Sequence, residues 1–206
     1  MAKMGLGIWI FNRKCRPLFG FISALSFESV IDVALLSAEC GTNRADPHLL
    51  KLMIMEKKFV FDYEHYDSIE QMPQADRLLI EEARKAVTTA NATYSKFCVG
   101  AAARLRSGKY IYGSNFESEV YPAGLCAERS LLFHAFACHK DDVIEALAIA
   151  SEPSLRECYP CGQCRQVLVD AERRQSSPIR IIMSGGGSAS VVKSAELLLP
   201  FTFILK

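Results

Sequence analysis

The sequence shows no marked excess of charge of either sign and contains no long apolar segment. Its 24 lysines and arginines stand against 23 aspartates and glutamates, a formal net charge of +1, and the basic residues form no large block. Proteins that bind nucleic acid tightly through its phosphates usually carry such a block, so we expect no nucleic-acid partner. The apolar runs fall short of the roughly 18 residues that a membrane-spanning helix needs, so we expect no membrane span either.

Cysteine is sparse for a disulfide-stabilised protein, with 8 residues in a chain of 206. Small secreted domains carry cysteines at a much higher density. Most of the cysteines here fall between residues 126 and 164, and such clustering is more typical of a metal or catalytic site in a reducing compartment. We therefore expect a cytoplasmic protein with free thiols.

No internal repeat or long low-complexity segment divides the chain. Its length, with 50% of the residues hydrophobic, suits one well-buried domain with a modest extension. Residues 1–54 show no clear period, and the composition changes at their end, beside Met53 and Met55. We therefore assign residues 55–206 to one folded domain and leave residues 1–54 as an unassigned N-terminal extension.

Three interpretations of residues 1–54 compete. A basic cluster at residues 13–16 followed by an apolar stretch resembles a secretory signal, although these charges come late and follow another apolar segment. The segment is alternatively a small cap packed on the domain, or upstream sequence translated from a misplaced start. We favour the misplaced start, because only this interpretation accounts for Met53 and Met55 at the change of composition. The segment should then be dispensable.

Hydrophobic periodicity predicts an α/β fold. Apolar residues from Leu79 to Ala90 recur at the spacing of one helical face, which predicts a helix over residues 74–91. Two further helices begin at Cys126 and Cys161, and they alternate with apolar strands, as expected for a three-layer α/β/α architecture around a mixed five-stranded sheet. The last two strands are joined by a short glycine-rich link, so they should be antiparallel neighbours. The expected strands cover residues 99–105, 110–114, 146–151, 178–183 and 190–194.

A pair of cysteines one helical turn apart opens the last of these helices. Cys161 and Cys164, in the segment PCGQC, can face one point at a helix N-terminus, where the helix dipole favours thiolates. On its own the pair fits a structural zinc site or a redox pair about as well as a catalytic site. Cys158 forms a second C-x-x-C with Cys161, but Pro160 suits the approach to a helix start and leaves Cys158 outside it.

Cys126 is the obvious third ligand, because it also opens a helix in an apolar context. Three protein ligands leave a fourth position open for water, as in catalytic zinc sites. Glu128 then lies near the metal without binding it, where its carboxylate can take up and return a proton. Arg129 and Arg165 are placed to donate to the sulfurs and to offset the charge of three thiolates.

The combination of C-A-E at residues 126–128 with P-C-x-x-C at residues 160–164 is the signature of zinc-dependent nucleobase deaminases. With YSKFCVGAA, NFE, YPAGLCAERS, PCGQCRQV and LLPFTF, the chain resembles the small, homotetrameric cytidine deaminases over residues 74–203. This resemblance implies a hydrolase of pyrimidine salvage that converts cytidine and 2′-deoxycytidine to the uridines with loss of ammonia. It also implies a nucleoside substrate, one zinc ion per chain and a homotetramer with shared active sites.

The same resemblance implies roles for residues outside the metal site. It implies that Asn115 and Glu117 contact the ribose and that Ala127 joins the substrate contacts. It implies that Phe97 stacks on the pyrimidine and that Phe203 reaches the active site of a neighbouring subunit. An amide and a carboxylate two residues apart at a strand end point the same way, which suits the binding of sugar hydroxyls.

The chain departs from the family pattern at three positions. Ser118 stands where asparagine is usual, Cys98 where proline is frequent, and Tyr159 where serine is common. Two other functions stay open. A deaminase of a modified nucleoside or nucleoside antibiotic need not keep the ribose contacts, and a non-catalytic structural zinc module predicts a fourth ligand, for which Cys158 is the closest candidate.

Overall fold

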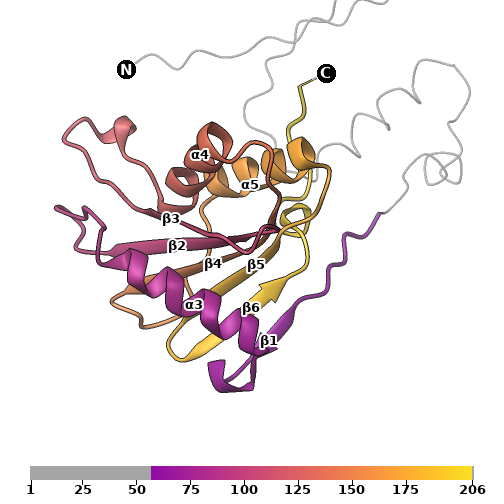
Figure 1. Ribbon diagram of the computed structural model, residues 1–206, viewed down its shortest axis with the longest axis horizontal. Coiled ribbons are helices and arrows are strands. Elements are labelled where there is room, and N and C mark those ends of the chain that lie inside the picture. The colour runs from indigo at the N-terminus through magenta and orange to yellow at the C-terminus, as the bar shows by residue number, and fades with distance from the viewer. Residues whose placement is uncertain (1–56, 206) are drawn as a thin grey trace, which may run out of the picture. The chain divides into compact units, whose positions relative to one another are not determined.

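The computed structural model describes residues 57–205 and shows a mixed sheet with helices on both faces (Figure 1). The predicted three-layer α/β/α fold is confirmed, while the extension over residues 1–54 lies outside the described residues. The elements are β1 (Glu64–Tyr66), η3 (Ile69–Gln71), α3 (Gln74–Val87), β2 (Cys98–Leu105), β3 (Tyr110–Ser114), η4 (Tyr121–Ala123), α4 (Ala127–Cys138), β4 (Ile144–Glu152), α5 (Gly162–Gln175), β5 (Arg180–Gly185), β6 (Ser188–Val192) and η5 (Ala195–Leu198).

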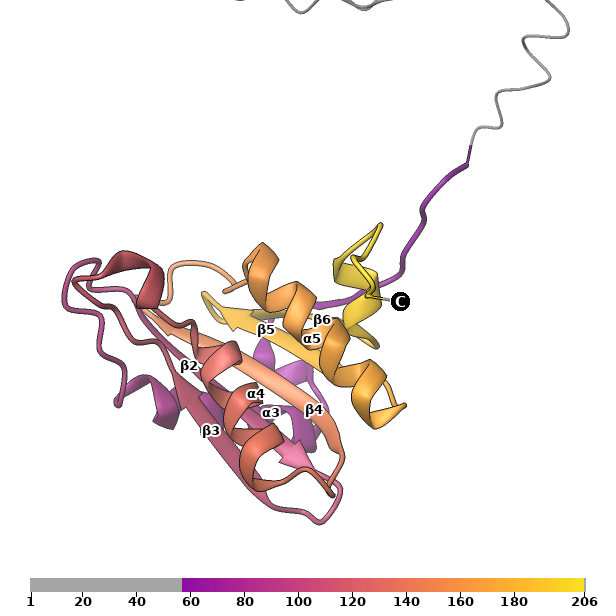
Figure 2. The same cartoon turned by 90° about the horizontal axis from the view of Figure 1, so that it is seen from above.

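The three layers are held together by two apolar cores, one on each face of the sheet. Helix α3 covers one face, while α4 and α5 lie side by side on the other (Figure 2). On the face covered by α4 and α5, Leu131 of α4, Leu147 of β4 and Leu168 of α5 are fully buried. On the face covered by α3, Ile80 of α3 and Ile182 of β5 are fully buried. Burying one such side chain contributes about 1.5–3 kcal/mol, so these cores fix the helices against the sheet.

The strand order is β1-β6-β5-β4-β2-β3, and only β4 and β5 among these neighbours run parallel. Helix α5 connects β4 to β5, and such a crossover is what a parallel pair requires. The turn from β5 to β6 uses Gly186 and Gly187 at φ values of +62° and +90°, a backbone conformation that favours glycine. The turn makes β5 and β6 antiparallel neighbours, as the glycine-rich link predicted.

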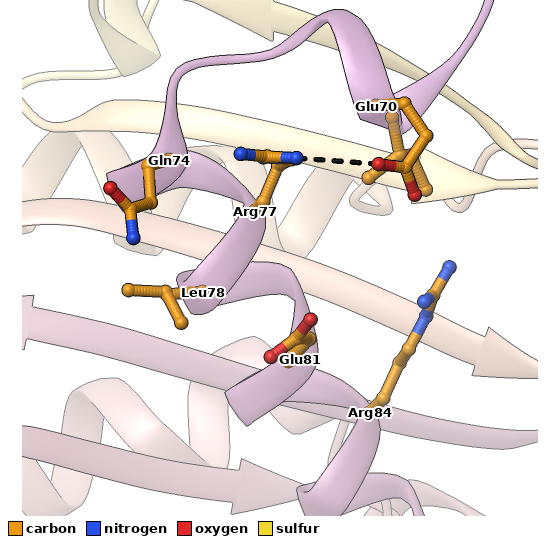
Figure 3. Close-up of a pocket in the computed structure, with 7 residues that line it drawn as sticks. Glu70, Gln74, Arg77, Leu78, Glu81 and Arg84 are labelled. Atoms are coloured by element: carbon orange, nitrogen blue, oxygen red, sulfur yellow. Dashed lines mark hydrogen bonds and ion pairs between the residues drawn. The ribbon is translucent and has the colours of Figure 1, made fainter.

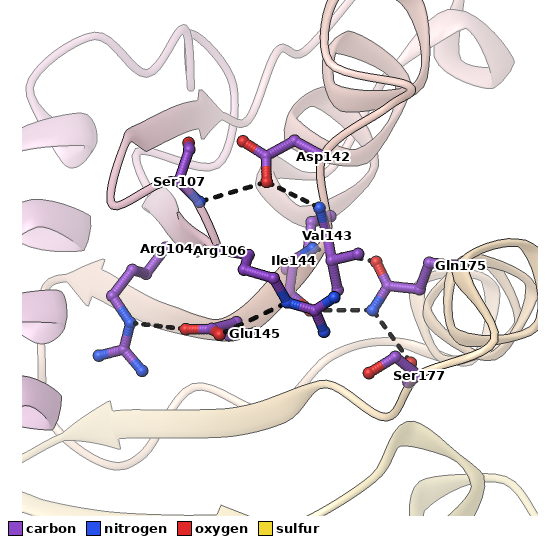
Figure 4. A network of polar contacts seen from close by, with 9 residues as sticks. All are labelled: Arg104, Arg106, Ser107, Asp142, Val143, Ile144, Glu145, Gln175 and Ser177. Carbon is purple, nitrogen blue, oxygen red and sulfur yellow. Dashed lines mark hydrogen bonds and ion pairs between the residues drawn. The ribbon is translucent and has the colours of Figure 1, made fainter.

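Polar contacts fasten the start of β4 to its surroundings (Figure 4). The Glu145 carboxylate lies 3.5 Å from Nε of Arg104 and 3.9 Å from Nε of Arg106. At the end of α5, Gln175 donates from Nε2 to the carbonyl of Ile144 over 2.9 Å and accepts from its amide over 3.0 Å. These contacts tie the C-terminal end of α5 to β4.

The sheet has a sixth strand, β1, which precedes the first of the five predicted strands. Strand β1 pairs with β6 at the edge of the sheet (Figure 1). Three residues are too few to display the alternation by which a strand is predicted from sequence. Arg180 holds this short strand, because its Nη2 lies 2.8 Å from Oε2 of Glu64 and 2.9 Å from Oδ2 of Asp76. The prediction of five strands is corrected to six.

Helix α3 ends at Val87, four residues before the predicted end at residue 91. The hydroxyl groups of Thr88 and Thr89 donate to the carbonyls of Lys85 and Ala86, each over 2.8 Å. Threonine side chains that bind nearby main-chain groups in this way compete with continuation of a helix. Neither α3 nor any other helix within residues 57–205 is long and apolar enough to span a membrane.

Candidate active site

Three cysteine sulfurs meet at the N-terminal ends of α4 and α5. Cys126 is the N-cap of α4, Cys161 is the N-cap of α5, and Cys164 lies in the first turn of α5. The Sγ of Cys161 lies 3.9 Å from the Sγ of Cys126 and 3.5 Å from that of Cys164. All three sulfurs lie within 4.8 Å of one another, and all three cysteines are free. The structure thus brings the three predicted ligands together.

The spacing and the chemistry of these sulfurs fit a zinc ion. Ligands placed tetrahedrally at a Zn–S distance of about 2.3 Å stand about 3.8 Å apart, close to the 3.9 and 3.5 Å that separate Cys161 from the other two sulfurs. The pKa of the Cys126 thiol is lowered to about 5, because the Cys164 thiol and then the Arg129 guanidinium donate to its sulfur, while burial opposes them. The thiolate is the form of cysteine that binds zinc. The cluster is therefore suited to hold a metal through three protein ligands.

Cys158 lies outside this cluster. Within the part of the chain that the structure describes, the group that can hold a metal consists of Cys126, Cys161 and Cys164. Burial raises the pKa of the Cys158 thiol to about 11, which keeps it protonated at neutral pH and makes it a poor ligand. Cys158 therefore does not supply the fourth ligand that the structural zinc module requires.

Glu128 is a buried carboxyl group in the first turn of α4, with 4% of its surface exposed. Burial raises its pKa to about 7. The negative charge of Cys126 acts in the same direction, as expected for a carboxyl group beside the sulfur cluster. A group whose pKa lies near the working pH can both take up and release a proton, so Glu128 is suited to general acid–base catalysis.

The two arginines that we expected to donate to the sulfurs have different partners. Arg129 donates from Nη2 to the Sγ of Cys126 over 3.8 Å. Arg165 donates instead to main-chain carbonyls, from Nε to Pro160 over 2.9 Å and from Nη1 to Leu198 over 3.2 Å. The expected contact between Arg165 and a sulfur is therefore corrected. This side chain joins the main chain just before α5 to the C-terminal segment.

The segment over residues 115–117 runs beside the start of α4. The amide of Phe116 donates to the carbonyl of Leu125 over 2.8 Å, and the amide of Leu125 donates back over 2.9 Å. On its other side the segment exchanges two hydrogen bonds with the main chain of Asn91, of 2.9 and 2.8 Å. Because Leu125 directly precedes the first cysteine of the cluster, these bonds place the predicted ribose-binding segment next to the metal site.

The side chains of Asn115 and Glu117 bind the main chain of the loop that leads into β2. Asn115 accepts at Oδ1 from the amide of Val99 over 2.7 Å and donates from Nδ2 to the carbonyl of Phe97 over 2.9 Å. Glu117 accepts at Oε2 from the amides of residues 94–95 over 2.7 and 3.1 Å. Both side chains therefore hold the loop that carries Phe97, a role that the sequence did not predict. Their contact with ribose stays a prediction.

The other predicted substrate contacts differ in exposure. Phe97 is 40% exposed and Phe203 is 67% exposed, so both rings are accessible in a single chain. The carbonyl of Phe203 accepts from Nε2 of Gln166 over 3.1 Å, which ties the C-terminal tail to α5. Ala127, the first residue of α4, is fully buried, and its contact with a substrate stays a prediction.

Two surface hollows lie away from the cysteine cluster. One, of about 280 Å³, lies against α3, where Arg77 pairs with Glu70 over 3.3 Å (Figure 3). The other, of about 530 Å³, is lined by Ser107 and residues 137–142. None of the three clustered cysteines lines either hollow, so these two hollows do not mark the cysteine site.

A buried acid near the cluster escapes prediction from the sequence. Glu157, four residues before Cys161, is 7% exposed and accepts a hydrogen bond from the Tyr159 hydroxyl. A lone acid in a loop is usually a solvated charge, so its type and position carry no signal of burial. The nearby Tyr159, two residues further along the chain, is the local signal in the sequence that this acid has a hydrogen-bond donor.

A family model describing the cytidine and deoxycytidylate deaminase zinc-binding region matches residues 73–177. The chain is 40% identical over 94 residues to the cytidine deaminase of Halalkalibacterium halodurans, an alignment that covers 46% of this chain and 70% of that protein. It is 37% identical over 101 residues to the cytidine deaminase of Mycobacterium tuberculosis, which covers 48% of this chain and 74% of the relative.

Solved structures give the same result. The crystal structure of cytidine deaminase from Burkholderia pseudomallei matches with a TM-score of 0.55 and 34% identity, over 64% of this chain and 100% of that chain. The structure of cytidine deaminase from Mycobacterium tuberculosis matches with a TM-score of 0.52 and 29% identity, over 65% of this chain and 100% of that chain. The three clustered cysteines and Glu128 all lie inside the range of the family model. The chain therefore belongs to the cytidine deaminase family, whose members are zinc-dependent enzymes.

Proposed function

We propose that this enzyme catalyses the hydrolytic deamination of cytidine and 2′-deoxycytidine to uridine and 2′-deoxyuridine, as a step of pyrimidine salvage. The observation that carries the proposal is the cluster of Cys126, Cys161 and Cys164 beside the buried carboxyl group of Glu128. The named relatives are cytidine deaminases, which supports cytidine as the substrate. Deamination of a modified nucleoside would use the same centre and is the alternative to be tested.

The chain supplies both the ligands and the proton carrier for this reaction. Cys126, Cys161 and Cys164 would hold one zinc ion per chain, whose Lewis acidity makes a water molecule a stronger nucleophile near neutral pH. Glu128 takes a proton from this water as its oxygen bonds to C4 of the pyrimidine, and passes the proton to N3. Glu128 then takes the second proton from the hydroxyl now on C4 and gives it to the amino group, so that the C4–N bond breaks, ammonia leaves and C4 becomes a carbonyl. Arg129, which donates to the Cys126 sulfur, offsets part of the thiolate charge.

The ribose is proposed to bind to Asn115 and Glu117. Asn115 has a second amide hydrogen and Glu117 has a second carboxylate oxygen besides those that bind the loop before β2, and these atoms suit sugar hydroxyls. The same two side chains fix the loop that carries Phe97, whose exposed ring is available to stack on the base. The main chain at Ala127 completes the proposed substrate contacts.

The active assembly is proposed to be a homotetramer in the cytoplasm, with each site shared between subunits. The C-terminal tail supports this proposal, because Phe201, Phe203 and Leu205 are each at least 67% exposed in the single chain. Apolar side chains gathered in this way usually mark a surface that a partner covers. A cytoplasmic location is proposed because thiolate ligands persist in a reducing compartment.

Exchange of Glu128 for glutamine separates the proton carrier from the metal ligands. The Glu128→Gln variant should bind zinc in the same amount as the unmodified chain, yet its kcat for cytidine should fall about 100- to 10,000-fold, because general acid–base catalysis is lost. Cys161→Ala should lose both zinc and activity. Glu81→Gln makes the same exchange at an exposed position of α3 and should change neither. Equal loss of zinc from Glu128→Gln and Cys161→Ala would show that Glu128 is a ligand and would refute this division of roles.

The substrate and the assembly are tested with the unmodified chain. The absorbance change on loss of the exocyclic amine reports turnover of cytidine, 2′-deoxycytidine and ring-modified analogues in parallel. Turnover of an analogue with neither cytidine nor 2′-deoxycytidine accepted would favour the modified-nucleoside alternative. Light scattering at the assay concentration should give the mass of four chains, and an active monomer would contradict the shared-site arrangement.

A further inference from the structure

The loop that delivers Cys161 to the metal site lies directly on the end of β5. We call residues 153–161 the metal loop. Its amide at Cys158 donates to the carbonyl of Ser184 over 3.2 Å, and its carbonyl at Ser154 accepts from the amide of Gly186 over 3.1 Å. A Cβ at Gly185 would lie only 2.0 Å from the carbonyl oxygen of Arg156, so the close approach of the two backbones requires glycine there.

Glu157 is the buried centre of the contacts between the metal loop and the sheet. Its side chain is 6% exposed. Its Oε1 accepts from the hydroxyl of Ser188 over 2.8 Å, at the start of β6. Its Oε2 accepts from the hydroxyl of Tyr159 over 2.8 Å. One carboxylate therefore joins β6 to the residue that stands two positions before the metal ligand Cys161.

The same carboxylate reaches the edge strand β1. Nδ1 of His65 lies 3.5 Å from Oε1 of Glu157 and 3.1 Å from the hydroxyl oxygen of Ser190. On its outer side, Nε2 of His65 lies 3.3 Å from Oδ1 of Asp67. Strand β1 precedes residue 73, where the match to the family model begins, so His65 lies outside the matched region although Glu157 lies inside it.

The polar partners outweigh the cost of burying Glu157. Burial acts to raise the pKa of this carboxyl group, yet the pKa lies below its ordinary value, because hydroxyl donors and His65 stabilise the charged form. Tyr159 contributes little to the core, since 55% of its surface is exposed. The value of Tyr159 at this position therefore lies in its hydroxyl group rather than in packing. A buried carboxylate with several donors is a rigid point of attachment.

We propose that Glu157 is a positioning residue for the metal site. It fixes Tyr159 and, through it, the main chain that leads into Cys161, while His65 extends the same support to β1. This inference rests on the zinc site of the proposed function. Residues that orient a metal ligand without touching the metal typically change metal affinity or activity about 10- to 100-fold when they are removed. Loss of the Tyr159 hydroxyl should therefore loosen Cys161 without removing a ligand.

The test compares two tyrosines of the full chain, each of which donates a hydrogen bond from its hydroxyl group to a glutamate. Tyr159→Phe removes the bond to Glu157, and Tyr112→Phe removes a bond of 2.7 Å to Glu82 at the opposite edge of the sheet. The two side chains are similarly exposed, at 55% and 46%, so the second variant is a matched control. Two variants of Glu157 complete the set. Glu157→Ala removes both carboxylate oxygens, whereas Glu157→Gln keeps one acceptor oxygen and replaces the other oxygen with an NH2 donor.

Three measurements report the metal site and the fold separately. Zinc release is followed with an excess of a coloured chelator, thiol reactivity is followed with a chromogenic disulfide on the zinc-free chain, and the thermal midpoint reports stability.

Tyr159→Phe should release zinc about 10-fold faster than the unmodified chain and expose its thiols to faster reaction. Its kcat should fall while its KM for cytidine stays unchanged, because a metal ligand rather than a substrate contact has moved. Glu157→Ala should show a larger effect that Glu157→Gln partly restores.

Each outcome decides either this inference or the proposed function. Equal zinc release from Tyr159→Phe, Tyr112→Phe and the unmodified chain would overturn the positioning role. So would faster release in both tyrosine variants, because the effect would then not depend on Glu157. If Glu157→Ala does not fold, Tyr159→Phe and Glu157→Gln carry the decision. An unmodified chain that binds no zinc and leaves cytidine intact would overturn the proposed function instead.

Discussion

Replacing the buried Glu172 tests how the C-terminal segment is attached to α5. Its Oε1 accepts from the amides of Ile179 and Ala195, both over 2.7 Å, and its Oε2 accepts from the hydroxyl of Ser194 over 2.8 Å. A single carboxylate thus joins α5 to the start of β5 and to η5. The tail that carries Phe203 follows η5, so the same contacts fix the origin of that tail.

The size of the effect follows from the amides that would lose their acceptor. Ile179 and Ala195 are fully buried, so water cannot replace the carboxylate in Glu172→Leu. A buried donor left without a partner costs about 1–3 kcal/mol, which gives about 2–6 kcal/mol for the two amides. Domains of this size are stable by only about 5–15 kcal/mol, so a large share of the stability is lost. The thermal midpoint should fall by roughly 5–20 °C.

Glu172→Gln separates the hydrogen bonds from the shape of the side chain. Both amides bind the same oxygen, which glutamine retains. The new amide group can donate to the hydroxyl oxygen of Ser194, whose own hydrogen is then free to reorient. We therefore expect Glu172→Gln to cost no more than about 1.5 kcal/mol, the net value of one hydrogen bond.

Urea unfolding of the zinc-loaded chain, followed by circular dichroism, measures both variants against the unmodified protein. The slope of the free energy of unfolding against urea concentration should stay constant, so that the midpoint alone reports the change in stability. Similar losses for Glu172→Leu and Glu172→Gln would refute the reasoning, because the amides would then not depend on the retained oxygen. A loss of less than about 1 kcal/mol for Glu172→Leu would show that the amides find other partners.

Three further predictions address the loop before β2, the edge strand and the N-terminal extension. Asn115→Ala should raise the KM for cytidine and leave zinc content unchanged, because it frees the loop that carries Phe97; an unchanged KM would contradict this role. The Arg180 guanidinium holds the pKa of Glu64 below its ordinary value. The ion pair between them therefore stabilises the folded chain fully above the pKa that Glu64 has when unfolded, and this stabilisation is lost as the pH falls through the lower pKa of the folded state. Glu64→Gln should therefore flatten the loss of stability in acid, as urea midpoints at successive pH values would show. A chain beginning at Met55 should bind zinc and deaminate cytidine like the full chain, and loss of activity there would make residues 1–54 structural. A chain beginning at Asp67 lacks β1, so its thermal midpoint should be lower than that of the full chain.

The metal cluster could be predicted from the sequence because its geometry is local. Cys161 and Cys164 are one helical turn apart, so a helix that begins at Cys161 brings their sulfurs together whatever the rest of the chain does. Cys126 lies 35 residues before Cys161, so its assignment rested on its own position at a helix start and on the C-A-E signature that it opens. The order of strands and helices was equally accessible, since five of the six strands are long enough to show an apolar pattern.

Side-chain partners distant in the sequence could not be predicted in the same way. The sequence shows that Asn115 and Glu117 lie on one face, but not that the loop before β2 folds back to offer its amides to them. Arg165 likewise has a sulfur within four residues of its position, yet a guanidinium on a long side chain also suits carbonyls, and Leu198 is brought near only by the fold. Hydrogen-bonding capacity is a property of the residue type, whereas the partner is a property of the tertiary structure.

The buried acids show what this distinction means for the active site. Helix α5 holds two of the three predicted metal ligands, and a carboxylate anchors the chain near each of its ends. Glu157 fixes the loop before the helix through Tyr159, and Glu172 binds the chain that follows the helix through the Ile179 amide. The other ligand, Cys126, is placed by the main-chain pairing of Leu125 with Phe116 and by the apolar core beneath α4. The spacing of the three sulfurs therefore depends on polar anchors on one helix and on backbone pairing and apolar packing on the other. Removing the anchor at Glu157 should move Cys161 relative to Cys126, so zinc should be lost while the sheet and its helices stay folded.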